Sequence, residues 1–149
     1  MKPLIIVLLL LGANFAVKAQ LENPVRWSYA AKKINPKEAI LYLRADIEAG
    51  WHIYSQHMKP GGPITTTFNF SPSKNYTRVG GVIEPKAITK HEKVFNMNVS
   101  YFEKSVIFQQ RVKLNGKLPL SIKGRLEYMV CNDEQCLPPA EVEFGIVVK

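Results

Sequence analysis

The chain contains two cysteines, Cys131 and Cys136, which lie in the segment Tyr128–Pro139. A close pair of cysteines in an exported protein either closes a small structural loop or carries out thiol–disulfide exchange. A ring this small is expected to stabilise the fold by only about 2 kcal/mol, less than a disulfide between distant segments. The small structural benefit favours chemistry, but the spacing alone leaves both interpretations open.

The residues around the pair bear on its reactivity. Pro138 and Pro139 follow closely after Cys136 and stiffen the chain, which presents this cysteine at the edge of a turn. Asp133 and Glu134 lie between the cysteines, and nearby carboxylates disfavour a thiolate. The loop itself contains no Lys, Arg or His. These features fit a dithiol that reacts with selected partners, and they fit an inert disulfide equally well.

The N-terminus predicts export. Lys2 precedes the unbroken apolar run Leu4–Leu11, and Val17-Lys18-Ala19 supplies small residues for cleavage before Gln20. This is the three-part pattern of a secretory signal peptide, and the run is too short for a lasting membrane span. We therefore expect a signal peptide at residues 1–19, a periplasmic domain at residues 20–149, and no transmembrane segment in the mature chain.

Size and charge narrow the classes of function. The mature part has the length of one domain and can bury a core without a disulfide. The leader holds two of the 20 Lys and Arg residues and none of the 12 acidic ones, so the mature chain carries +6. Export argues against nucleic acid as a partner. The positive charge predicts either an ordinary solvated surface or a weak preference for anionic surfaces and acidic partners.

The elements that must position the cysteines read as strands. Apolar and polar residues alternate with a period of two, which indicates strands with one buried face. Turn signals separate these segments, among them Asn35-Pro36, Gly80-Gly81 and Asn115-Gly116. The pattern predicts an all-β, immunoglobulin-like antiparallel β-sandwich from about residue 24 onward, without a helix. The alternating segments are residues 25–29, 41–47, 64–70, 106–114, 126–130 and 142–148.

Three stretches resemble a known family. The segment Glu127–Pro139 resembles the redox segment of the N-terminal periplasmic domain of the disulfide reductase DsbD. Gly50–Ser55 is similar to a Gly-aromatic-x-x-Tyr strand of that family, and Val99–Ser105 is similar to its cap loop. The stretches occur in the family's order and span most of the mature chain.

The resemblance implies an immunoglobulin-like domain that relays reducing equivalents in the periplasm, as a component of a protein-disulfide reductase. In that family a membrane-embedded segment reduces a thioredoxin-like domain, which reduces the immunoglobulin-like domain. Exported proteins such as disulfide isomerases and cytochrome c maturation proteins then accept the electrons. The redox group is the cysteine pair itself, so no other cofactor is expected.

The resemblance also implies roles for single residues. Cys136 matches the cysteine that forms mixed disulfides with partners, and Cys131 matches its resolving mate. Tyr101 matches the aromatic residue of the cap loop, with Phe102 beside it, and Tyr54 matches a supporting tyrosine near the pair. An aromatic cover over a disulfide would exclude casual thiols until a cognate partner moves it.

The sequence departs from the family pattern in four respects. The cysteines are one residue closer than in the best-known member, and His52 stands where an aromatic residue is expected. Val99 and Ser100 replace acidic residues of the cap loop. The chain ends at Lys149 without a membrane segment or a thioredoxin-like domain, so we expect its electron donor to be a separate protein.

A metal site is not expected, because His52, His57, His91 and the cysteines match no zinc spacing. Two readings of the function stay open at this point, and the redox relay is one of them. The other reading of the chain is a non-catalytic immunoglobulin-like binding or adhesion module whose disulfide is purely structural. Redox behaviour separates the two functions, since a carrier's disulfide is reducible by a thioredoxin-like protein with little loss of fold.

Overall fold

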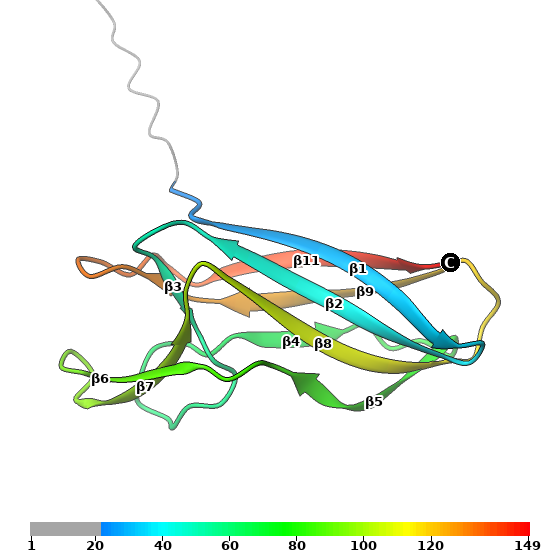
Figure 1. Cartoon of the computed structure of the whole chain (residues 1–149), viewed down its shortest axis with the longest axis horizontal. Coiled ribbons are helices and arrows are strands. Elements are labelled where there is room, and N and C mark those ends of the chain that lie inside the picture. Colours follow the sequence, from blue (N-terminus) through cyan, green and yellow to red (C-terminus); the bar gives the residue numbers. More distant parts are fainter. Residues whose placement is uncertain (1–21) are drawn as a thin grey trace, which may run out of the picture.

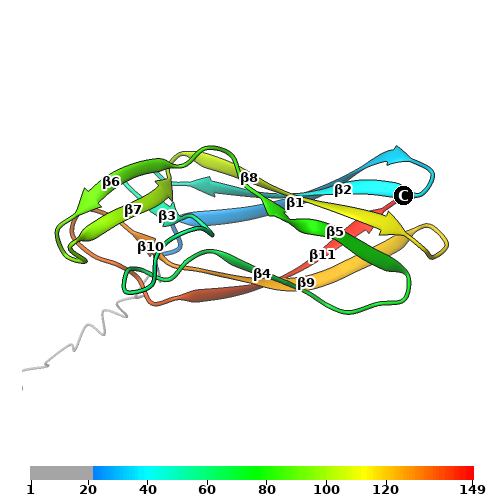
Figure 2. The ribbon, with the colours of Figure 1, turned by 90° about the horizontal axis from the view of Figure 1, so that it is seen from below.

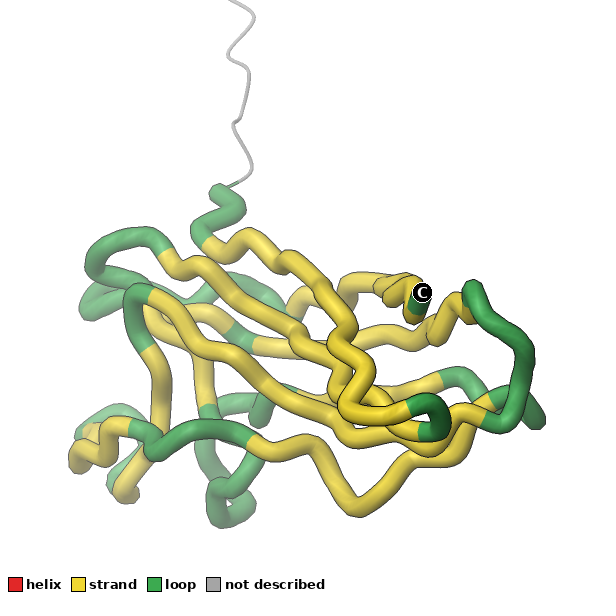
Figure 3. Tube along the Cα trace, turned by 45° about the vertical axis from the view of Figure 1, so that its right-hand side comes forward, coloured by secondary structure: helices red, strands yellow, loops and turns green. Residues whose placement is uncertain are grey.

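The structure is a computed structural model that describes residues 22–149. The expected signal peptide, residues 1–19, lies outside the described residues. Every regular element of the described part is a β-strand (Figure 3), and none of it forms a helix long and apolar enough to cross a bilayer. The strands are β1 (Val25–Asn35), β2 (Glu38–Ile47), β3 (His52–Tyr54), β4 (Thr67–Phe70), β5 (Tyr76–Ile83), β6 (Ile88–Glu92), β7 (Met97–Phe102), β8 (Ser105–Leu114), β9 (Leu120–Tyr128), β10 (Val130–Cys131) and β11 (Ala140–Val148).

The strands form three antiparallel sheets. One sheet has the order β1-β2-β8-β5 and packs against a second sheet of order β11-β9-β4. A smaller sheet, β10-β3-β7-β6, extends from one end of this sandwich (Figures 1 and 2). The arrangement confirms the predicted all-β antiparallel sandwich. The two termini of the described part lie at opposite ends of the long axis.

The core follows the period-two pattern. In β2 the side chains of Leu41 and Leu43 are fully buried, and in β8 those of Phe108 and Val112 are fully buried. Trp27 lies between the two sheets, with its ring centroid 6.1 Å from that of Phe108. Alternation therefore places one row of side chains in the core and the next row in water.

One turn prediction is wrong. Gly80 and Gly81 lie inside β5, where the register with β8 shifts between Val79 and Ile83. Gly80 has a φ of 70°, so the glycine pair serves a β-bulge within the strand. The edge strands β5 and β6 were not predicted because most of their residues are exposed and show no clean alternation.

Candidate functional site

The two faces of the small sheet have different surroundings. Ile53 pairs with Val130 on one side and with Phe102 on the other, and all three side chains belong to the main core. Neighbouring residues of a strand point to opposite faces, and paired residues share a face. The pairs Cys131–His52 and Tyr54–Tyr101 therefore lie on the second face, which carries its own apolar cluster.

The cysteines form a disulfide on this second face, with 4.0 Å between their Cα atoms. Cys131 closes β10 and is only 2% exposed, whereas Cys136 is exposed to solvent. A buried cysteine and an exposed cysteine in one disulfide are not equally accessible to an attacking thiolate. The two cysteines of the pair therefore differ in accessibility, and Cys136 is the accessible one. We call this difference the polarity of the pair.

Hydrogen bonds hold the loop between the cysteines in shape. The side-chain oxygen of Asn132 accepts hydrogen bonds from the backbone N–H groups of Glu134 and Gln135, both at 2.8 Å. The backbone N–H of Asn132 donates to the carbonyl of Gln135, and that of Leu137 donates to the carbonyl of Val130. This Asx-type turn and the strand-like closure after it fix the position of Cys136 without help from the disulfide.

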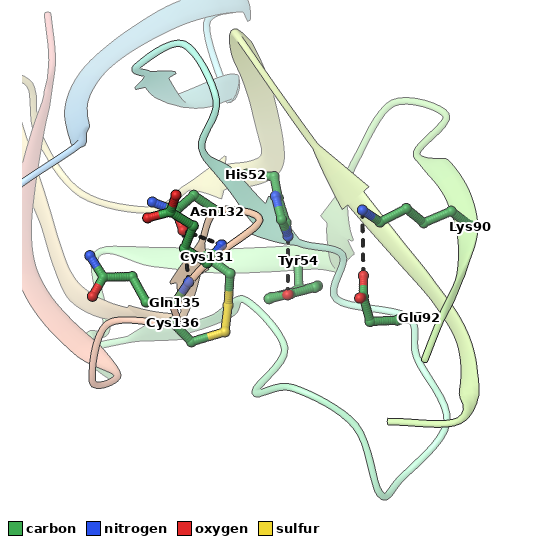
Figure 4. Close-up of a disulfide and its surroundings, with 9 residues drawn as sticks. His52, Tyr54, Lys90, Glu92, Cys131, Asn132, Gln135 and Cys136 are labelled. Carbon is green, nitrogen blue, oxygen red and sulfur yellow. Dashed lines mark hydrogen bonds and ion pairs between the residues drawn. A yellow bond between two sulfur atoms is a disulfide. The ribbon is translucent and has the colours of Figure 1, made fainter. Parts of the chain in front are cut away.

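A cavity of about 230 Å³ opens beside the disulfide (Figure 4). Three separate parts of the chain line it: the cysteine loop, β3, and the β6–β7 hairpin. The hairpin contributes both charged and apolar side chains. The lining residues outside the cysteine loop are His52, Tyr54, Lys90, Glu92, Val94 and Phe95.

The turn of the β6–β7 hairpin lines the cavity beside the disulfide. Glu92 pairs with Met97, so residues 93–96 form the turn. Within it Phe95 is partly buried against the cluster that contains Cys131, whereas Val94 is 84% exposed. The turn therefore places one apolar side chain against this cluster and another in solvent.

The two predicted cap residues, Tyr101 and Phe102, lie on opposite faces of β7. Val99–Ser105 is not a loop, because most of it belongs to β7 and the start of β8. Tyr101 packs beneath the cavity in the cluster of Cys131, with its ring 4.9 Å from that of His52. Phe102 points the other way and stacks edge-to-face on Phe108 in the main core, at 5.7 Å.

Assigning Phe102 to a cap was therefore wrong, since strand alternation turns it away from the disulfide. Phe95 is a further aromatic residue at the cavity, beside His52 and Tyr54, and it was not among the predicted residues. One signal could have indicated it. The segment Lys93–Asn96 is too short to bury a phenylalanine against its own hairpin, so this side chain has to contact another part of the chain.

Charged and hydrogen-bonding groups reach the cavity from other strands. The Nε2 atom of His52 lies 3.1 Å from the hydroxyl of Tyr54. Burial, and then the positive charge of Lys90, lower the pKa of His52, although Glu92 acts in the opposite direction. Burial raises the pKa of Tyr54 to about 12. At neutral pH both side chains are therefore uncharged.

Lys90 supplies the positive charge that the cysteine loop lacks. Its Nζ lies 3.4 Å from a carboxylate oxygen of Glu92 and 5.3 Å from the ring centroid of Tyr101. The sequence analysis found no cation inside the loop, and Lys90 comes from a strand some 40 residues away. The pairing of β6 with β7 brings it to the same cavity as the disulfide.

Three methionines surround the same cluster. Met58, Met97 and Met129 are partly buried against the group formed by Tyr54, Val99, Tyr101 and Cys131. The only other methionine of the chain is Met1. Methionine side chains adapt their shape at low cost and recur on surfaces that accept different partners. Within residues 22–149 no group of three His, Cys, Asp or Glu side chains is placed to hold a metal ion.

Comparison with known families gives one match over most of the chain. The sequence model of the family described as "Thiol:disulfide interchange protein DsbD, N-terminal" matches residues 19–147. A search of curated protein sequences finds no significant match.

Solved structures share the fold at low sequence identity. The N-terminal domain of DsbD from Neisseria meningitidis, in its reduced form, is 16% identical and superposes with a TM-score of 0.52 over 82% of this chain and 85% of that one. In the complex of the DsbD and PilB N-terminal domains from the same organism, the matching chain is 16% identical. It superposes with a TM-score of 0.55 over 85% of this chain and 87% of that one. The N-terminal periplasmic domain of ScsB from Proteus mirabilis is 16% identical and superposes with a TM-score of 0.54, over 81% of this chain and 44% of that one.

Proposed function

This chain belongs to the family of DsbD N-terminal domains, and we propose that it relays reducing equivalents by thiol–disulfide exchange through Cys131 and Cys136. The fold is the immunoglobulin-like sandwich of that family. The observation that carries the proposal is the unequal exposure of the two cysteines, one buried and one exposed, beside a cavity that the β6–β7 hairpin lines. A purely structural disulfide requires neither the unequal exposure nor the cavity.

The domain is loaded in two steps. A thiolate of the donor attacks the Sγ of the exposed Cys136, the bond to Cys131 breaks, and Cys131 leaves as a thiolate. A second thiol of the donor, once deprotonated, then attacks the donor sulfur that is bonded to Cys136. This step forms the donor's disulfide and releases Cys136. The donor is oxidised to a disulfide, the domain is reduced by two electrons, and both cysteines end as thiol or thiolate.

Delivery runs through the same sulfur. The thiolate of Cys136 attacks the disulfide of an oxidised target and forms a mixed disulfide. Cys131 then attacks Cys136, re-forms the internal disulfide and releases the reduced target. The short framework held by Asn132 keeps the two cysteines close throughout, because its hydrogen bonds do not depend on the disulfide.

The cavity is suited to the thiolate that forms at Cys131. Burial disfavours that charge, and Asp133 and Glu134 disfavour it further. Lys90 supplies a compensating positive charge at the cavity wall, and the hydroxyl of Tyr54 and the ring of His52 lie on the same face. These three side chains are the groups that we propose support the leaving thiolate.

We propose that Phe95 is the cover and that Tyr101 and Tyr54 form the floor beneath it. Phe95 lines the cavity from a hairpin turn, so its displacement would uncover the disulfide while β6 and β7 stay paired. Tyr101 and Tyr54 are paired across two strands and buried, which suits a fixed support.

The compartment and partners belong to the same proposal. We propose a cleaved signal peptide at residues 1–19 and a periplasmic redox domain at residues 20–149. Its donor would be a thioredoxin-like protein linked to a membrane electron transporter, and its acceptors exported thiol proteins, including those of cytochrome c biogenesis. Support comes from the family match and from the solved complex of a DsbD N-terminal domain with a PilB N-terminal domain.

A trapping experiment tests the proposal. A reduced Cys131→Ser variant lacks the resolving thiol, so we expect it to accumulate a mixed disulfide through Cys136 with an oxidised thioredoxin-like protein. The matched Cys136→Ser variant is expected to trap nothing. Non-reducing electrophoresis and mass spectrometry of the adduct provide the readout.

Equal trapping by both variants would contradict the polarity. No trapping by either one, with a disulfide that resists a reduced thioredoxin-like protein, would favour a structural disulfide in a binding module.

A further inference from the structure

Many of the basic side chains gather at the end of the sandwich opposite the disulfide. The β1–β2 hairpin, the segment before β5, the β8–β9 connection and the end of β11 meet there (Figures 1 and 2). Strand β8, which runs between the two ends, spans about 30 Å. Seven exposed lysines lie at this far end, which we call the lysine end: Lys32, Lys33, Lys37, Lys74, Lys113, Lys117 and Lys149.

The lysine end accounts for the whole net charge of the described chain. With Arg78 and Arg111 it holds nine cationic side chains and one carboxylate, that of Glu38, so its formal charge is +8. The other described residues comprise nine cationic and eleven acidic side chains, which sum to −2. A basic surface that is merely solvated would spread its charge, whereas this one concentrates it at the pole farthest from the disulfide.

The chemistry of the lysine end suits a broad anionic surface better than a single bound anion. Arginine recognises discrete oxyanions with two parallel hydrogen bonds, but both arginines here are already engaged: Arg111 binds Glu38 at 2.8 Å, and the Nε of Arg78 donates to Gln110 at 3.0 Å. The groove beside the ion pair, lined by Lys37, Glu38 and Lys113, contains that carboxylate and would repel an anion. The lysines come from four separate segments and point into solvent, as expected for contact with many headgroups at once.

An apolar side chain accompanies the charges. Ile34 lies at the tip of the β1–β2 hairpin, directly after Lys32 and Lys33, and is 47% exposed. A basic cluster with an exposed apolar residue is the pattern of a segment that rests in the headgroup region of a bilayer. We propose that the lysine end binds the anionic surface of a phospholipid bilayer, with Ile34 entering the interface.

Such binding would orient the domain. The small sheet, whose strand β10 carries Cys131 of the disulfide, lies at the opposite end (Figure 1), so a bilayer-bound molecule would project Cys136 away from the lipid and leave it open to partners. The proposed donor of this domain is membrane-linked. A domain that is bound to the bilayer would meet such a donor by diffusing along the membrane surface. The binding itself involves no thiol chemistry, so it can fail or hold independently of the redox proposal.

Vesicle binding tests the inference. The oxidised chain of residues 20–149, which contains every described strand, is incubated with vesicles of phosphatidylcholine alone or mixed with phosphatidylglycerol, and bound protein is measured by sedimentation. We expect binding only with phosphatidylglycerol, weakening as ionic strength rises. Because each lysine near an anionic surface contributes about fivefold, K32Q/K33Q/K37Q should lower partitioning by about a hundredfold.

The control variant K59Q/K86Q/K93Q removes the same charge from exposed lysines elsewhere. We expect it to keep its affinity within about twofold, since those charges are more than a Debye length from a bilayer at the lysine end. Ile34→Ser should weaken binding severalfold. All variants change exposed side chains, and circular dichroism checks their fold.

Three results would overturn the inference. Equal losses in the two triple variants would show that net charge alone matters. Equal binding to both kinds of vesicle would exclude an electrostatic surface. Failure to bind vesicles, together with retention on an immobilised acidic peptide, would replace the bilayer by a soluble acidic partner.

Discussion

The two faces of the small sheet contain neighbouring residues of the same strands, yet one face packs into the main core and the other carries the disulfide. Ile53, Phe102 and Val130 pack into the sandwich. One residue away on each strand, Tyr54, Tyr101 and Cys131 point to the second face. That face is covered only by the cysteine loop, the β6–β7 turn and methionine side chains.

The element that covers a sheet face decides whether that face can hold a reactive site on this fold. A face sealed by an opposing sheet can only contribute stability, whereas a face sealed by a turn can be opened without unfolding. The difference also explains why the second face tolerates an exposed disulfide and polar groups such as His52 and Lys90. Substitutions on the two faces should therefore affect different measurements.

The largest effect on stability is expected from the core face. Phe102→Ala removes a buried ring that contacts Phe108 and should lower the free energy of unfolding by about 3–5 kcal/mol. Urea denaturation measures it. Phe102→Leu is the milder control, which should keep the rate of reduction of the disulfide unchanged. A loss below about 1 kcal/mol for Phe102→Ala would mean that the two faces are not distinct in this way.

Opening the disulfide should cost less. The small ring predicts a loss of about 2 kcal/mol on reduction, and the hydrogen bonds of Asn132 should keep the loop folded. Urea unfolding with and without reductant measures the difference, and a double Cys131→Ala, Cys136→Ala variant serves as control. A cost near that of Phe102→Ala would instead identify the disulfide as a main support of the fold.

The cover should change reactivity more than stability. Phe95→Ala is expected to raise the rate of reduction by a small thiol about tenfold, which corresponds to about 1.4 kcal/mol of activation free energy. Its stability should fall by less than about 1 kcal/mol, because Phe95 is only partly buried. Phe95→Leu keeps the bulk and should stay near the parent rate. Unchanged kinetics in both variants would remove the cover from the mechanism.

The smallest effect concerns pH and the second face. The pKa of His52 is lowered from 6.5 on folding, so the unfolded chain binds the proton more readily. Stability then rises with pH in the window below 6.5, and this contribution is lost as pH falls through the folded pKa. His52→Phe should flatten that slope. Thermal melts between mildly acidic and neutral pH measure it, with His57→Phe as the exposed control; an unaltered slope in His52→Phe would assign the dependence to other groups.

The sequence by itself determined the architecture and the reactive pair. Alternation with a period of two is a local property, so β2, β8 and β11 could be predicted from their own residues, and the family followed from three short segments. Edge strands carry little of that signal because both of their faces meet water, which is why β5 and β6 were missed. The glycines of β5 mark a bulge that looks like a turn in the sequence.

Only the tertiary structure decided what surrounds the pair. Lys90, His52 and Phe95 reach one cavity because β6, β7, β3 and β10 pair in a particular register. A shift of one residue would turn Lys90 and His52 to the opposite face. Phe102 faces the core for the same reason, whereas Phe95 reaches the cavity from the turn between β6 and β7. Alternation shows that adjacent residues face opposite sides, but only the packed sheets decide which side is the core.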